Sequence, residues 1–116
     1  MPLAAAQVRL ILLESAKCHG EQAAVRYSHL LLATFQTVGE RPDTAGATNL
    51  LRFPGVRAFP ARLVRDRLAP EHRVRSPRHI VLYRVAPDGV VDILAVIHDR
   101  MLLSRAAGRA VRAANS

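Results

Sequence analysis

Among the side chains of this sequence that could transfer protons, act as nucleophiles or bind a metal are five histidines and one cysteine. The histidines are scattered, and no two have the spacing of three or four residues that places two ligands on one face of a helix. They are His19, His29, His72, His79 and His98. Cys18 and His19 are adjacent and point in different directions on a helix. We therefore predict no metal and no other cofactor, and we interpret Cys18 as a buried packing residue at a helix end.

Motifs for nucleotide binding and for hydrolysis are absent. The chain contains no GxxxxGKS/T phosphate-binding loop, no GxGxxG fingerprint and no GxSxG nucleophile turn. The sequence therefore gives no support to a nucleotide-binding protein or a serine hydrolase.

The charge is strongly positive and unevenly distributed. The net charge is +8, and residues 1–40 are balanced, so the excess lies further along the chain. The central excess consists of Arg52, Arg57, Arg62, Arg65, Arg67, Arg73, Arg75, Arg78 and Arg84 against only Asp66 and Glu71, and the tail adds Arg100, Arg105, Arg109 and Arg112. This asymmetry indicates an anionic partner, such as RNA, DNA, a protein–DNA complex or an acidic protein, although a solvated arginine-rich surface fits as well.

The length and the apolar content bound the architecture. The 116 residues suit one domain, 1–116, with a single modest core, and half of them are apolar. No apolar run is long enough to span a bilayer, and the first residues lack the pattern of a signal peptide. One cysteine excludes an internal disulfide framework. We expect a cytoplasmic protein with no membrane contact.

The N-terminal third is expected to form a helical hairpin over residues 4–39. Apolar residues recur at spacings of three and four residues from Ala4 to Lys17, and again from Glu21 to Val38. Gly20 separates the two helices, and Gly39 fits the C-terminal stop of the second.

A β-sheet is expected over residues 56–98. The β-branched runs Ile80–Val85 and Val90–Ile97 flank the turn residues Ala86–Gly89, which predicts a β-hairpin. Val56–Val64 predicts a further strand, with Pro60 at an edge or a bulge. Residues 42–54 and 65–77 are expected to be loops, the second of them basic. The basic tail 99–116 is either a short helix or frayed. The fold class is therefore α+β, with the helical hairpin packed on a small antiparallel sheet.

The hairpin also carries a resemblance. The segment Pro77–Val85 with its Arg78-His79 and Tyr83-Arg84-Val85, the turn Asp88-Gly89, and the segment Ile93–Met101 with His98 resemble the C-terminal half of the RelE/ParE toxin superfamily, and the ParE branch in particular. In the helical region Gly20, Gln22-Ala23 and Tyr27 stand in an order similar to the family's. Members of this family usually open with a short strand, for which Met1-Pro2-Leu3 leaves almost no room, so the first strand is expected to be missing unless the true start lies upstream.

The resemblance implies a toxin of a type II toxin–antitoxin pair that poisons DNA gyrase without catalysis. It implies a ParD-like antitoxin as partner, in a toxin–antitoxin hetero-oligomer. The candidate target contacts are Arg67, Arg78, His98, Arg100 and Arg105. Charge reversal at Arg100 together with Arg105 is expected to relieve toxicity without unfolding the chain.

Two alternatives remain open. The RelE branch of the superfamily implies an mRNA endonuclease acting on the ribosome, with Arg78, His98 and Arg65 as the catalytic candidates. The other alternative is a degenerate, non-toxic protein that binds the antitoxin. Structural roles are also open, with His79 half-buried and Arg78 or Arg84 paired with Asp92 across the hairpin.

Overall fold

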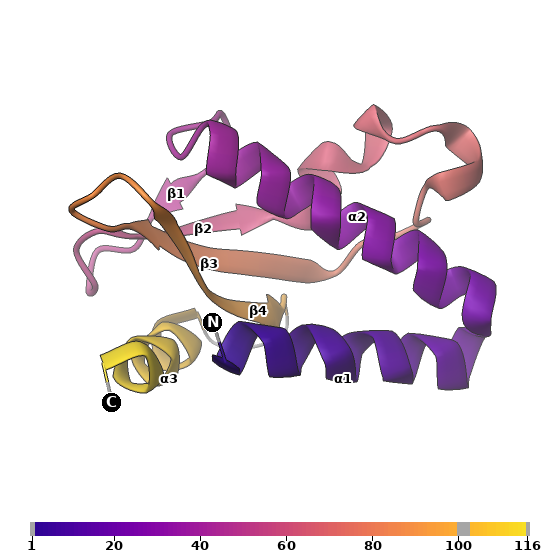
Figure 1. Cartoon of the computed structure of the whole chain (residues 1–116), viewed down its shortest axis with the longest axis horizontal. Coiled ribbons are helices and arrows are strands. Elements are labelled where there is room, and N and C mark those ends of the chain that lie inside the picture. The colour runs from indigo at the N-terminus through magenta and orange to yellow at the C-terminus, as the bar shows by residue number, and fades with distance from the viewer. Residues whose placement is uncertain (1, 100–102, 116) are drawn as a thin grey trace.

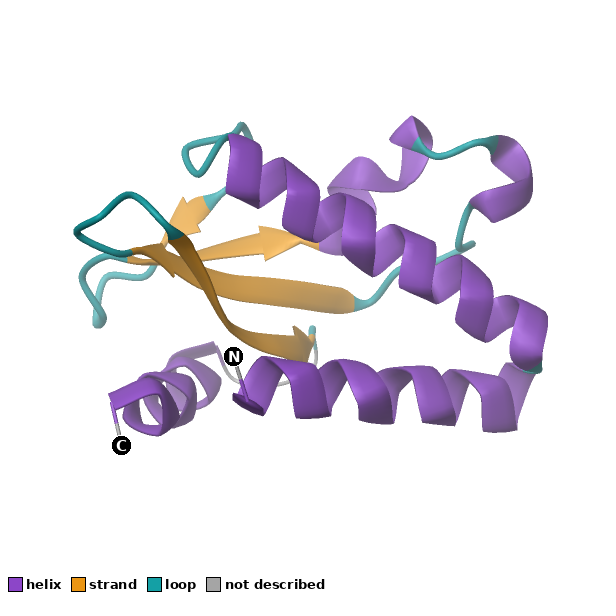
Figure 2. Cartoon of the chain, viewed as in Figure 1, coloured by secondary structure: helices purple, strands orange, loops and turns teal. Residues whose placement is uncertain are grey.

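The computed structural model of the chain describes residues 2–99 and 103–115 (Figure 1). Two helices come first, a four-stranded sheet follows, and a third helix closes the chain (Figure 2). The elements are α1 (Pro2–His19), α2 (Glu21–Glu40), β1 (Thr48–Asn49), β2 (Val56–Pro60), the 3₁₀-helices η1 (Ala61–Arg67) and η2 (Pro70–His72), β3 (His79–Val85), β4 (Val91–His98) and α3 (Leu103–Asn115). The predicted α+β class with a helical hairpin ahead of an antiparallel sheet is confirmed.

The helical hairpin bends where the sequence predicts it. Gly20 separates α1 from α2 with a φ of +91°, a conformation that a side chain disfavours. The sequence predicts that the second helix stops at Gly39, but the helix continues to Glu40. Gly39 has no positive φ, and Pro42 ends the helix instead, because a proline disfavours the helical conformation of the residue before it, here Arg41.

The β-hairpin forms as predicted. Gly89 adopts a φ of +87°, and the Val90 amide donates a 3.0 Å hydrogen bond to the Asp88 carboxylate. Backbone bonds between Ala86 and both Gly89 and Val90, each 2.8 Å long, close the turn. The hairpin fixes the antiparallel register in which His79 lies opposite His98.

The sheet extends further than predicted at one edge. Its strand order is β1-β2-β3-β4, and β1 lies inside the segment 42–54 that was expected to be a loop. Strand β2 ends at Pro60 rather than at Val64, and the chain turns there into η1. Strand β1 pairs only with Arg57 and Ala58 of β2, so no strand lies beside Pro60 at this edge of the sheet. The missing N–H of Pro60 therefore removes no hydrogen bond between strands.

Helices cover both faces of the sheet (Figure 1). On one face, Leu30, Leu31 and Val38 of α2 pack with Val81 and Tyr83 of β3. On the other face, α3 packs through its alanines. This second layer contains Ala106, Ala107 and Ala110 against Val56, Ala58, Leu82, Leu94, Ala95 and Ile97. The sequence does not decide whether the basic tail forms a helix or is frayed. In the structure it forms a packed helix from Leu103 to Asn115.

Strand β4 forms the other edge of the sheet, and α1 runs beside it (Figure 1). The Gln7 side-chain oxygen accepts a 2.7 Å hydrogen bond from the Val96 amide on this edge. No strand precedes α1 within the described residues. The described residues therefore contain no counterpart of the short opening strand that the family resemblance implies.

Candidate functional site

A cavity lined by both polar and apolar side chains lies at the end of the sheet where β3 begins and β4 ends. His79 and His98 are cross-strand neighbours, and their rings meet edge to face with centroids 5.3 Å apart. The cavity has a volume of about 710 Å³ and also borders α1, α2 and the segment before β3. Its lining is Ile11, Glu14, Ser15, Cys18, His19, Tyr27, Val74, Arg75, Ser76, Arg78, His79 and His98.

His79 is held in its neutral form by its surroundings. Burial lowers the pKa of His79 to about 4, and the neighbouring His98 acts in the same direction against the opposing effect of Asp99. The Tyr27 hydroxyl hydrogen-bonds Nδ1 of His79 and lies 3.4 Å from the Arg78 amide, whose N–H it accepts. Because a neutral imidazole can accept at Nδ1, the hydroxyl donates there. His79 is thus almost entirely uncharged at neutral pH.

His98 lies beside a carboxylate. Its Nδ1 lies 3.1 Å from one carboxylate oxygen of Asp99, and the other oxygen accepts a 2.8 Å hydrogen bond from Nε of Arg78. Asp99 therefore bridges the imidazole and the guanidinium. A carboxylate on one ring nitrogen fixes the tautomer and orients the other nitrogen for contact with a ligand. This bond with Asp99 also raises the pKa of Arg78.

The arrangement supplies one group for proton transfer and one for binding a phosphate. Cleavage of RNA needs a base for the 2′-hydroxyl, an acid for the leaving oxygen and a cation for the phosphate. His98 fits one proton-transfer role and Arg78 fits the third. His79 lies beside them but, with a pKa of about 4, it is a poor proton donor at neutral pH. The site is therefore better suited to binding an anion than to acid–base catalysis.

Of the candidate residues that the structure describes, Arg78 and His98 are brought together in this cavity. Arg65 does not line this cavity; its Nε donates a 2.6 Å bond to the Val74 carbonyl, and its guanidinium pairs with Asp66. Arg67 lies 3.1 Å from the Thr37 hydroxyl of α2.

The two tail candidates lie elsewhere. Arg105 is exposed on α3, away from the lining of this cavity. Arg100 lies outside the described residues.

Sequence reasoning missed Tyr27 and Asp99 as members of the site, and it treated His79 as structural. Tyr27 belongs to the apolar stripe of α2, and that pattern alone could not show that its hydroxyl meets a histidine 52 residues away. The signal for Asp99 was its position directly after His98 at a strand end. Cys18, expected to be buried, is exposed at the mouth of this cavity, because α1 ends at His19 on the rim of the molecule.

No group of three or more His, Cys, Asp or Glu side chains within residues 2–99 and 103–115 is placed to hold a metal ion. No helix in that part of the chain combines the length and apolarity needed to cross a membrane.

The fold and the site define a class of protein. A helical hairpin followed by an antiparallel sheet, with a polar cluster where the last strand ends, is the architecture expected of the RelE/ParE superfamily. The model of the family described as the ParE toxin of the type II toxin–antitoxin system, parDE, matches residues 2–103, and the chain belongs to this family. A comparison with curated proteins gave no match. The family implies an antitoxin as partner.

Proposed function

We propose that this toxin acts on DNA gyrase, and that it acts by binding and not by catalysis. The family membership supports a toxin of the gyrase-directed branch. The observation that carries the non-catalytic mode is the state of His79. Its low pKa and its bond to Tyr27 make His79 a poor proton donor at neutral pH, so the two histidines do not form an acid–base pair. Gyrase is a cytoplasmic enzyme, so the proposed location is the cytoplasm.

The proposed partner is a ParD-like antitoxin in a toxin–antitoxin hetero-oligomer. Its toxin-binding arm is expected to carry acidic groups, because the toxin has a net charge of +8. A disordered arm that orders on binding can cover a large surface of this kind. Binding is accordingly expected to weaken as salt concentration rises.

The decisive experiment is a supercoiling and cleavage assay with purified gyrase. The toxin is added alone and then together with the product of its neighbouring gene. Trapped cleaved DNA that disappears on addition of the neighbour supports the proposal. Gyrase that is unaffected at saturating toxin contradicts it.

A charge-reversal variant tests the proposed contact surface. Arg100→Glu with Arg105→Glu is expected to lower gyrase trapping at least tenfold at unchanged thermal stability, because Arg105 is exposed on α3. The matched control is Arg9→Glu with Arg62→Glu, which makes the same charge change at exposed positions on α1 and η1. Equal losses in both double variants would show a general charge effect and would remove the tail from the target surface.

One observation favours a second candidate, cleavage of mRNA on the ribosome. The Asp99 carboxylate orients His98 and holds Arg78 beside it, which is a workable base and phosphate ligand. Fragments of mRNA in a translation extract, together with unaffected gyrase, would establish this candidate. A protein that is silent in both assays but still binds the antitoxin would be the degenerate, non-toxic form.

A further inference from the structure

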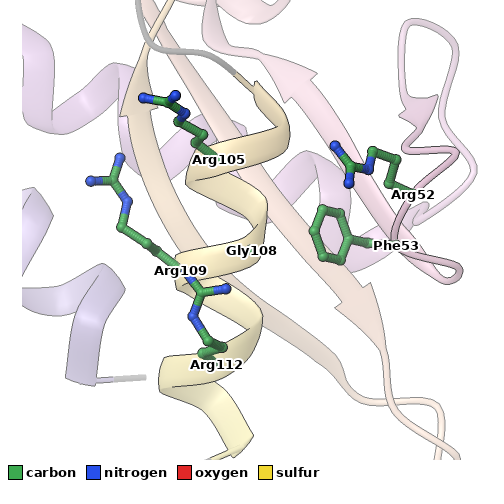
Figure 3. A pocket seen from close by; sticks show the side chains of 6 residues that line it. All are labelled: Arg52, Phe53, Arg105, Gly108, Arg109 and Arg112. Atoms are coloured by element: carbon green, nitrogen blue, oxygen red, sulfur yellow. The ribbon is translucent and has the colours of Figure 1, made fainter.

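A second cluster of polar side chains lies on the opposite side of the sheet. Helix α3 carries Arg105, Arg109 and Arg112 at spacings of four and three, which places them along one side of the helix. Arg52 and Phe53 approach from the turn between β1 and β2 (Figure 3). Together with Gly108 these residues line a cavity of about 320 Å³, called here the arginine pocket.

Gly108 forms the floor of the arginine pocket. A Cβ atom at this position would lie 3.4 Å from Cζ of Phe53 and 3.4 Å from a terminal nitrogen of Arg112. The aromatic ring and this guanidinium therefore both lie close to the bare backbone of Gly108. Figure 3 shows the Phe53 ring and the Arg52 side chain on the side of their loop that faces α3.

The four arginines of the pocket are not neutralised by the fold. Within residues 2–99 and 103–115 no carboxylate lies within 4 Å of their guanidiniums, and no hydrogen-bond acceptor serves them. Six arginines outside the pocket do have such partners, whereas five others in the described part of the chain (Arg9, Arg26, Arg41, Arg62 and Arg75) have none. The six are Arg57, Arg65, Arg67, Arg73, Arg78 and Arg84. Four like charges around one cavity repel each other, and a bound polyanion removes that repulsion.

The Phe53 ring distinguishes between the classes of polyanion that could bind in the arginine pocket. Guanidiniums form paired hydrogen bonds with phosphates and with carboxylates alike. Phe53, however, is half-buried with its ring on the cavity, and it offers a surface on which a nucleobase can stack. An acidic peptide would leave that ring unused, and a base-paired duplex does not expose the faces of its bases.

We infer that the arginine pocket binds single-stranded nucleic acid. Arg105, Arg109 and Arg112 contact successive phosphates, their Cα atoms being separated by about 6 and 4.5 Å along the helix axis. One base stacks on Phe53 over Gly108, and Arg52 closes the opposite side. This site is separate from the cavity of His79 and His98 and does not depend on gyrase being the target.

The test is direct binding of a fluorescently labelled twelve-residue oligothymidylate, followed by anisotropy at several salt concentrations. Arg109→Gln is expected to reduce the slope of log affinity against log salt by about 0.7, the value for one phosphate contact on a single strand. The control Arg62→Gln, on η1 outside the pocket, is expected to leave the slope unchanged. Equal slopes for Arg109→Gln and the unchanged protein, or no binding of the oligonucleotide, would overturn the inference.

The aromatic contribution has its own pair of variants. Phe53→Leu is expected to weaken oligonucleotide binding about 5- to 100-fold without altering the salt slope, and to leave the binding of inorganic polyphosphate unchanged. Because Phe53 also packs against the α3 layer, Gly108→Ala serves as the second variant. The added methyl group of Gly108→Ala occupies part of the pocket and also favours the helical conformation. This variant is therefore expected to bind the oligonucleotide less tightly and to unfold at a higher temperature.

Two outcomes would count against a nucleic acid. Tighter binding of an oligoglutamate peptide than of the oligonucleotide would assign the arginine pocket to an acidic protein. Unchanged oligonucleotide affinity in both Phe53→Leu and Gly108→Ala would remove the base-stacking role. Since the assay contains neither gyrase nor ribosomes, its result is independent of the proposed function.

Discussion

At the scale of single residues, the two histidines at the end of the sheet differ because their neighbours differ. His79 faces the buried side with Tyr27, so its charged form is disfavoured. His98 lies at the strand end, with its Nδ1 3.1 Å from a carboxylate oxygen of Asp99. Two side chains of the same type, paired across one hairpin, thereby have different surroundings: His79 bonds a half-buried tyrosine, and His98 lies beside a carboxylate.

The low pKa of His79 predicts a dependence of stability on pH. The unfolded chain takes up a proton on His79 near pH 6.5, whereas the folded chain does so only near pH 4. The free energy of unfolding is therefore expected to fall as the pH drops through this window, by less than about 1.4 kcal/mol per pH unit because one partly exposed group is involved. Above pH 6.5 this contribution is fully present.

Urea unfolding at several pH values measures this effect. His79→Gln keeps a hydrogen-bond partner for Tyr27 but cannot titrate, so its stability is expected to fall less steeply between pH 6.5 and 4. His19→Gln, exposed at the end of α1, is the matched control and is expected to follow the unchanged protein. Parallel curves for His79→Gln and the unchanged protein would refute the assignment.

At the scale of elements, α1 protects the edge strand β4. A strand edge exposes unpaired amides that can recruit another chain. Here α1 lies along that edge, and the Gln7 side chain satisfies the Val96 amide. A single side-chain acceptor thus replaces part of what a neighbouring strand would supply.

Removal of this acceptor is expected to loosen the edge. Gln7→Ala should lower the free energy of unfolding by about 1 kcal/mol and speed hydrogen exchange of the Val96 amide. Gln7→Glu keeps an acceptor and should retain slow exchange. Gln22→Ala, exposed on α2, is the control. Slow exchange at Val96 in Gln7→Ala would show that another group satisfies this amide.

At the scale of the whole molecule, the sheet is the middle layer between α2 and α3, and each face has its own buried cluster. Leu82 points into the α3 layer, whereas its neighbours Val81 and Tyr83 point into the α2 layer. The alternation of side chains along β3 therefore couples both layers through one strand.

Leu82→Ala tests this coupling. Truncation of this fully buried side chain is expected to cost about 2–5 kcal/mol, and the helical signal and the tyrosine fluorescence should be lost in one transition. Leu51→Ala, at a side chain that is 97% exposed, should change stability by less than about 0.5 kcal/mol. Early loss of helix with intact tyrosine fluorescence would show that α3 detaches on its own.

The sequence by itself determined the helical hairpin, the β-hairpin and the family resemblance. These depend on local patterns: apolar spacing in Ala4–Val38, the φ > 0 requirement at Gly20 and Gly89, and the β-branched runs on either side of the turn. The sequence did not predict elements whose local signal is weak, such as the strand within residues 42–54. Strand β1 has two residues and forms only because β2 lies beside it.

Only the tertiary structure decided the two sites. Tyr27 meets His79 across 52 positions, Gln7 meets Val96 across 89, and Phe53 lies beside Gly108 on the α3 side of the sheet. Each of these contacts depends on how α1, α2 and α3 pack on the two faces of the sheet. Local propensity specifies which residues face inward, but the partner of each residue follows from the packing of distant elements, which no short stretch of sequence contains.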